Sequence, residues 1–167
     1  KQLPSGLYFV ALIFLFTPWW SAGCGREKAI SFTGVQTVTG FNLETVTGFD
    51  ASSMASFGLK TKTEEVPPDP LVIAAMLLAV AALIFGMTIG RKALFGAGAM
   101  GFIAGVLLLI FKARVDAKVL EVGKGAIQVT FESGFWTTVA TFFVAAVAQL
   151  LIAKQIAHTP EPIAHNT

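Results

Sequence analysis

The sequence has few of the residue types that carry enzyme chemistry. Its 167 residues include one cysteine and two histidines, and only 13% of the chain is charged. A single cysteine cannot form an intramolecular disulfide and is too few for a metal site. Both histidines, His158 and His165, lie near the C-terminal end, and no nucleophile–base pair is visible. We therefore expect no catalytic residue, no metal site and no cofactor.

Charged residues are also missing from four long apolar stretches, at residues 6–22, 71–89, 93–111 and 135–153. Each stretch comes close to the ~20 residues that an α-helix needs to cross ~30 Å of hydrocarbon. Because lipid offers no partner for an unpaired backbone amide, the sequence predicts four transmembrane helices. Proton relays, ion pathways and carriers of charged substrates need ionisable groups inside the membrane. A pump or a transporter acting alone is therefore not expected.

The fold class predicted from these stretches is an all-α membrane protein, with residues 1–167 in one polytopic domain. The chain is 54% hydrophobic, and its charged content lies well below that of globular proteins, in which charged residues reach roughly 25%. The formal net charge of +2 is spread along the chain without a block of Lys or Arg, so no nucleic-acid partner is expected. We expect an integral protein of a bacterial inner (cytoplasmic) membrane.

Two long loops, residues 24–69 and 112–134, are expected to form a small β-rich cap outside the membrane. The first loop contains a repeat, residues 35–42 followed by residues 43–50. In each unit Thr, Val and Phe favour a short strand, whereas Gly with Asn or Asp favours a turn. An ordered cap over the bundle and a specific ligand site are both compatible with this segment.

The second loop predicts a β-hairpin from residues 119–122 and 126–132, joined by a glycine-containing turn. Ile127, Val129 and Phe131 alternate with polar residues, as expected for a strand with one apolar face. The cap should therefore contain strands from both loops.

The three tryptophans lie at the ends of apolar stretches. Trp19 and Trp20 end the first stretch, and Trp136 begins the last one. An indole ring is amphipathic and prefers the headgroup level of a bilayer. We expect all three to be interfacial anchors.

The only cysteine, Cys24, follows Ser, Ala and Gly in a pattern that resembles a lipobox. In a lipoprotein the chain is cleaved before this cysteine and the thiol is acylated. The alternative is a retained first helix with a lone thiol at its end, and it is the alternative that we expect.

Small residues recur at four-residue spacing in the second and third apolar stretches. They are Gly86 and Gly90, followed by Ala97, Gly101 and Gly105. Small residues at this spacing let transmembrane helices approach closely. In the same stretch, Gly96, Gly98 and Gly101 match the G-x-G-x-x-G dinucleotide fingerprint, but no strand precedes them, so that match carries no function. The predicted packing face serves either the helices of this chain or docking to other integral membrane subunits.

Four spans would put both termini on one side of the membrane. Arg91 and Lys92 occupy the tight corner between the second and third stretches without a neighbouring acid, which favours a cytoplasmic corner and cytoplasmic termini. The raw count of Lys and Arg favours the opposite orientation, because the long loops contain more of them. We prefer the termini inside.

Several motifs resemble those of uncharacterised small four-helix membrane proteins of bacteria. They are Pro18–Trp19, Ser21, Cys24, Phe32–Thr33–Gly34 and Gly134–Phe135–Trp136. That resemblance implies no activity. The layout of a long strand-bearing first loop, a tight corner and a shorter second loop is also similar to claudin-type tetraspan proteins. The paired loop cysteines of claudins are missing here, so this second likeness concerns topology only.

Two functions follow from these observations. The first is a non-catalytic accessory or structural subunit of a larger membrane complex, with other membrane subunits and lipids as partners. The alternative is a binding module whose outward β-cap recognises a soluble or surface partner. An enzyme is not expected.

Overall fold

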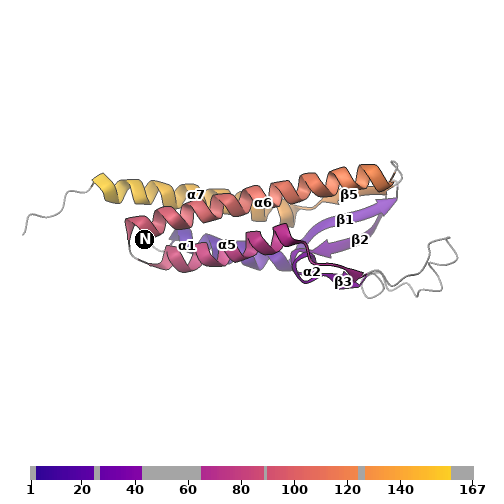
Figure 1. Cartoon of the computed structure of the whole chain (residues 1–167), viewed down its shortest axis with the longest axis horizontal. Coiled ribbons are helices and arrows are strands. Elements are labelled where there is room, and N and C mark those ends of the chain that lie inside the picture. The colour runs from indigo at the N-terminus through magenta and orange to yellow at the C-terminus, as the bar shows by residue number, and fades with distance from the viewer. Residues whose placement is uncertain (1–2, 25–26, 43–64, 89, 124–126, 159–167) are drawn as a thin grey trace, which may run out of the picture.

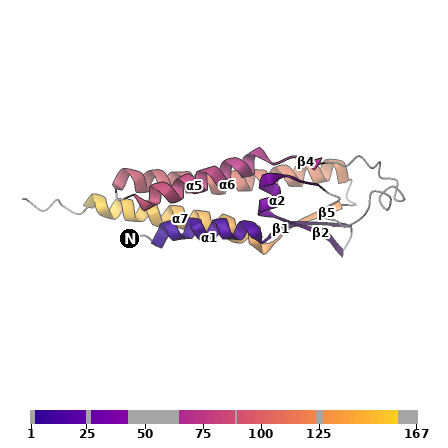
Figure 2. The same ribbon diagram turned by 90° about the horizontal axis from the view of Figure 1, so that it is seen from below.

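The computed structural model describes residues 3–24, 27–42, 65–88, 90–123 and 127–158. These residues form an elongated molecule in which helices fill one end and a small sheet the other (Figure 1, Figure 2). The four long helices are α1 (Leu3–Ile13), α5 (Pro70–Met87), α6 (Arg91–Gly123) and α7 (Ser133–His158). The start of α1 and the end of α7 both lie at the end away from the sheet (Figure 1).

Three helices in the described part of the chain are long and apolar enough to cross a membrane. Their candidate spans are Pro70–Met87, Lys92–Val119 and Ser133–Ile156. A shorter apolar helix covers Ser5–Phe16. The protein is therefore mostly helical with three candidate spans, which suggests an integral membrane protein.

The first predicted stretch, residues 6–22, is not helical throughout, so its expected end is wrong. Helix α1 continues into the short 3₁₀-helix η1 (Phe14–Phe16), and strand β1 (Pro18–Cys24) begins two residues later. Pro18 is the reason: it lacks a backbone N–H and disfavours the helical region for the preceding residue. Thr17 accordingly has an extended backbone, with φ −86° and ψ 159°.

The sheet at the other end has three antiparallel strands in the order β2-β1-β5, with β2 at Glu27–Thr33 and β5 at Ile127–Phe131. Strand β1 pairs with both neighbours, and Trp20 lies opposite Phe32 on one side and Phe131 on the other. The prediction of a strand at the second loop, and of a cap with strands from both loops, is therefore confirmed.

The predicted partner of that strand, residues 119–122, is helical and belongs to α6, so the hairpin was wrong. Helix α6 also passes well beyond the predicted span end at residue 111, and its last part runs beside the sheet (Figure 1). No Pro or Gly interrupts the sequence between Gly105 and Gly123. The polar residues after Phe111 support a solvated helix instead, since Lys112 pairs with Asp116 one turn later.

The first repeat unit, residues 35–42, is not a strand and a turn. It forms helix α2 (Gly34–Thr39) followed by the two-residue strand β3 (Phe41–Asn42), which pairs with β4 (Glu65–Val66). A capping box explains the helix, because Thr33 Oγ1 accepts from the Gln36 backbone N–H and Gln36 Oε1 accepts from the Thr33 N–H. The second unit, residues 43–50, lies outside the described residues.

Trp19 forms the centre of the junction between the helices and the sheet. Its ring is fully buried (0% exposed) and meets Phe135 edge to face, with the ring centroids 5.6 Å apart. Its Nε1–H donates to the Phe14 carbonyl at 2.9 Å, and its own carbonyl accepts from the Glu132 N–H at 2.8 Å. The indole expected at the headgroup level is thus enclosed by protein.

In the bundle, α5 packs on α6, α6 on α7, and α1 on both α5 and α7. The phenol of Tyr8 in α1 reaches across and donates to the Ala97 carbonyl of α6 at 3.1 Å. Gly101 faces the same phenol, because a Cβ there would lie 2.6 Å from Tyr8 Cε1. The small residues of α6 therefore let helices of this chain approach one another.

The three threonines of α7 differ from Gln149 in how their polar groups are paired. Thr137, Thr138 and Thr141 each donate to the carbonyl four residues earlier in α7. Gln149 is fully buried, and neither its Nε2 nor its Oε1 has a hydrogen-bond partner among the described residues. Gly86 lies beside it, since a Cβ there would be 2.7 Å from Ser5 Oγ and 3.5 Å from Gln149 Cδ. The amide is enclosed at the contact of α1, α5 and α7.

Replacing Gly101 with leucine should destabilise the protein. Intrinsic helix propensity alone favours the change, because leucine is a better helix former than glycine. The buried Tyr8 ring occupies the space, however, and overpacking of a filled core costs about 1–3 kcal/mol. We expect a lower thermal unfolding midpoint for Gly101→Leu in detergent.

The matched control is Gly96→Leu, the same substitution on the same helix. A Cβ at Gly96 would meet nothing within 4 Å, so this variant should unfold at or slightly above the wild-type midpoint. Equal midpoints for the two variants would contradict the packing described for Tyr8.

Candidate functional site

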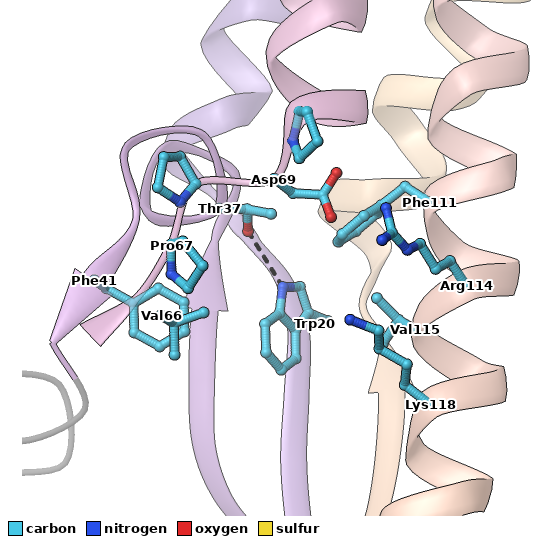
Figure 3. A pocket seen from close by; sticks show the side chains of 12 residues that line it. Trp20, Thr37, Phe41, Val66, Pro67, Asp69, Phe111, Arg114, Val115 and Lys118 are labelled. Carbon is cyan, nitrogen blue, oxygen red and sulfur yellow. Dashed lines mark hydrogen bonds between the residues drawn. The ribbon is translucent and has the colours of Figure 1, made fainter. Parts of the chain in front are cut away.

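A pocket of about 320 Å³ lies where the sheet meets the helices (Figure 3). One wall comes from α6 as it passes the sheet, and the opposite wall comes from β1, α2 and the chain leading into α5. The lining residues are Trp20, Thr37, Phe41, Val66, Pro67, Pro68, Asp69, Pro70, Phe111, Arg114, Val115 and Lys118. A volume of this size falls at the lower end of small-ligand pockets, which span ~300–1,000 Å³.

Aromatic rings form the back of this junction pocket. Trp20 stacks on Phe32 with the centroids 4.1 Å apart, and Phe32 in turn lies 4.6 Å from Phe41. The Trp20 Nε1–H donates to Thr37 Oγ1 at 3.2 Å, which fixes the edge of the indole (Figure 3). Thr37 Oγ1 itself donates to the Thr33 carbonyl at 3.0 Å. The ring positions are therefore held by both packing and hydrogen bonds.

The chain entering α5 is tied to α2 next to these rings. The Asp69 N–H donates to the Thr37 carbonyl at 3.2 Å, and Asp69 Oδ1 accepts from the Leu71 N–H at 2.8 Å as the N-cap of α5. Gly40, with φ +76°, allows the turn between α2 and β3. A side chain there would also meet the Val66 carbonyl at 2.7 Å, so this turn requires glycine.

Two cations on successive turns of α6 face the pocket. Arg114 extends toward Asp69 and Lys118 toward Trp20 (Figure 3). Neither has an ion-pair or hydrogen-bond partner among the described residues. Lys112 differs, because it pairs with Asp116 and its Nζ lies 5.2 Å from the centroid of the Phe131 ring. With one carboxylate and two cations, the pocket is net positive.

The pocket offers aromatic surface and charged side chains. Within the described ranges, no group of three or more His, Cys, Asp or Glu side chains is placed to hold a metal ion. Aromatic walls with unpaired cations at the rim suit a ligand that has both an apolar part and an anionic group.

The residues singled out from the sequence fall in several places. Gly105 packs on Phe143, with a Cβ distance of 3.0 Å to Cζ, and Gly86, Ala97 and Gly101 lie at the helix contacts described above. Gly90 has open space around it. None of these small residues lines the pocket.

The other singled-out residues lie near the sheet. Trp20 lines the pocket, Trp19 is buried against Phe135, and Trp136 is 46% exposed at the start of α7. Cys24 ends β1, where its backbone pairs with Glu27 and Ile127. Anchoring by Trp136 and modification of Cys24 stay predictions.

Sequence reasoning missed most of the pocket. No sequence pattern above singled out Arg114, Lys118 or Asp69; both cations are exposed and line the pocket. The Asp-Pro pair before an apolar run is a helix N-cap signal, and the i, i+4 spacing of the cations would place them on one helix face. Their meeting with Trp20 depends on tertiary structure, which no local pattern shows.

The sequence matches no family model and no curated protein. The case for a function therefore depends on the junction pocket itself.

Proposed function

We propose that the protein is a non-catalytic integral membrane protein whose sheet end binds a ligand. The observation that carries this proposal is the junction pocket, where ordered aromatic rings and two cations without a partner among the described residues surround about 320 Å³. Exposed cations that line a pocket and form no ion pair with the described residues there are available for charge-assisted hydrogen bonds to an anionic ligand. This proposal develops the binding-module alternative from the sequence.

The accessory-subunit hypothesis has less support. It was motivated by the small-residue face, and the closest neighbours of Gly86, Gly101 and Gly105 belong to this chain. Those residues therefore need no second protein to explain them. The remaining exposed apolar side chains of α5, α6 and α7 suit contact with lipid as well as with a partner.

We further propose that α1 with η1 is a fourth, short span and that both termini are cytoplasmic. Fourteen residues, Leu3 to Phe16, reach roughly 20 Å at 1.5 Å per helical residue, less than the ~30 Å hydrocarbon core. A short span is accommodated by local thinning of the bilayer. The membrane would then be the bacterial inner membrane, with the sheet on the outer face.

The ligand-binding proposal predicts a bound small molecule rather than a protein partner. Protein purified in mild detergent should show, by native mass spectrometry, the mass of the chain with a small-molecule adduct. The variant Val115→Phe, which fills the pocket, should lose the adduct, because Val115 lines it and is only half-buried. Val147→Phe, at an exposed position on α7, should keep it.

Recovery of a stoichiometric protein partner, together with an adduct that persists in Val115→Phe, would favour the accessory subunit instead.

The orientation proposal predicts opposite labelling at the two ends of the molecule. In a Cys24→Ser background, Ser31→Cys on β2 should react with a membrane-impermeant thiol reagent in intact spheroplasts. Lys92→Cys in the first turn of α6 should react only after lysis. Both positions are exposed, so access to the side chain is matched. Labelling of Lys92→Cys in intact spheroplasts and of Ser31→Cys only after lysis would place the sheet on the cytoplasmic side instead.

A further inference from the structure

The junction pocket lies at the start of span α5 and beside the last part of the α6 span, after its uncharged run. Span α5 starts at Pro70, directly after the pocket residue Asp69. On α6 the uncharged run ends at Phe111, and Arg114 and Lys118 follow within two turns. If these helices cross a bilayer, the pocket opens at headgroup level, with its apolar base toward the hydrocarbon.

The charges of the pocket select for an anion. Arg114 and Lys118 point into it and have no partner among the described residues, as Figure 3 illustrates. The Asp69 Oδ1 atom is engaged by the Leu71 N–H, so this carboxylate serves as a helix cap and does not pair with either cation. An incoming phosphate would meet a guanidinium and an ammonium on adjacent turns of one helix, a geometry that suits several charge-assisted hydrogen bonds.

The apolar part of the pocket continues toward the helices. Phe111 is almost fully buried and lies one turn before Val115, and Pro70 is a further lining residue. A volume of about 320 Å³ accommodates a headgroup with its glycerol but not a whole lipid. Acyl chains would leave along the exposed apolar surface of α5 and α6.

We propose that the junction pocket binds the phosphate-bearing headgroup of an anionic phospholipid. Arg114 and Lys118 pair with the phosphate, and Trp20 with Phe41 covers the carbon skeleton of the headgroup. This assignment rests on the proposed ligand-binding function and names its ligand chemistry. Anionic phosphate is shared by lipid headgroups and free phosphate, and a bilayer source is favoured by the position of the pocket beside the start of α5.

The test measures binding of phosphatidylglycerol to the full-length protein in detergent, titrated by native mass spectrometry. Wild-type protein should bind it more tightly than phosphatidylcholine, whose headgroup carries no net charge. The double variant Arg114→Gln/Lys118→Gln should lose about a hundredfold in affinity, since a hydrogen bond to a charged group contributes about tenfold and two are removed. The matched control Lys92→Gln removes an exposed cation at the other end of α6 and should bind as wild type.

A second variant separates loss of charge from loss of shape. Val115→Phe keeps both cations but fills the pocket, so it should also lose preferential binding. Equal affinity of the double variant and of Lys92→Gln for phosphatidylglycerol would overturn the headgroup assignment. Displacement of the lipid by equimolar inorganic phosphate or glycerol 3-phosphate would contradict the claim that the ligand is a membrane lipid.

The two proposals fail in different ways. Suppose that the adduct is lost in Val115→Phe but that Arg114→Gln/Lys118→Gln binds phosphatidylglycerol as tightly as wild type. The headgroup inference is then wrong, and the proposed ligand-binding function stands. If no adduct depends on Val115, the proposed function is wrong as well.

Discussion

The burial of one indole, that of Trp19, holds the two ends of this molecule together. The ring sits where η1 ends, where α2 begins and where α7 begins, and it contacts all three. A Cβ on Gly34 would lie 2.5 Å from Trp19 Cε2, and one on Gly134 would collide with the Pro18 carbonyl oxygen. Both glycines are therefore needed for close approach of backbone to ring and strand. Truncating a buried tryptophan to alanine lowers the free energy of unfolding by about 3–5 kcal/mol, so the packing of Trp19 contributes strongly to the stability of the fold.

The length of α6 provides one wall of the junction pocket. The helix continues past the apolar run, so that Arg114 and Lys118 reach the level of Trp20 on β1. The opposite wall is held by a separate set of bonds, in which α2 is capped by Thr33 and tied to the start of α5 by the Asp69 N–H. Rigid elements thus position charge and aromatic surface on facing walls, as a binding site requires. The helices α1, α5, α6 and α7 hold these walls in place.

Local patterns in the sequence predict the parts of this fold that depend on local chemistry. The uncharged runs predicted helices where α5, α6 and α7 lie. The alternation of Ile127, Val129 and Phe131 predicted strand β5. The end of α1 was missed although Pro18 marks it, because apolar character continues through the strand that follows. Helix α2 was missed because β-favouring Val and Thr outweighed the Thr33–Gln36 capping signal. The pocket could not be predicted, since β1, the start of α5 and the far end of α6 meet only in three dimensions.

The central claim is that Trp19 lies inside the protein at the junction, whereas Trp136 lies at its surface. Single-tryptophan variants with phenylalanine at the other two positions allow a direct test in bilayers that contain brominated lipid, with acrylamide as a second, aqueous quencher. Trp19 is fully buried and Trp136 is 46% exposed, so fluorescence from Trp19 alone should resist both quenchers and that from Trp136 alone should be quenched by the lipid. Quenching of Trp19 by brominated lipid as strong as that of Trp136 would contradict this account and return Trp19 to the membrane interface.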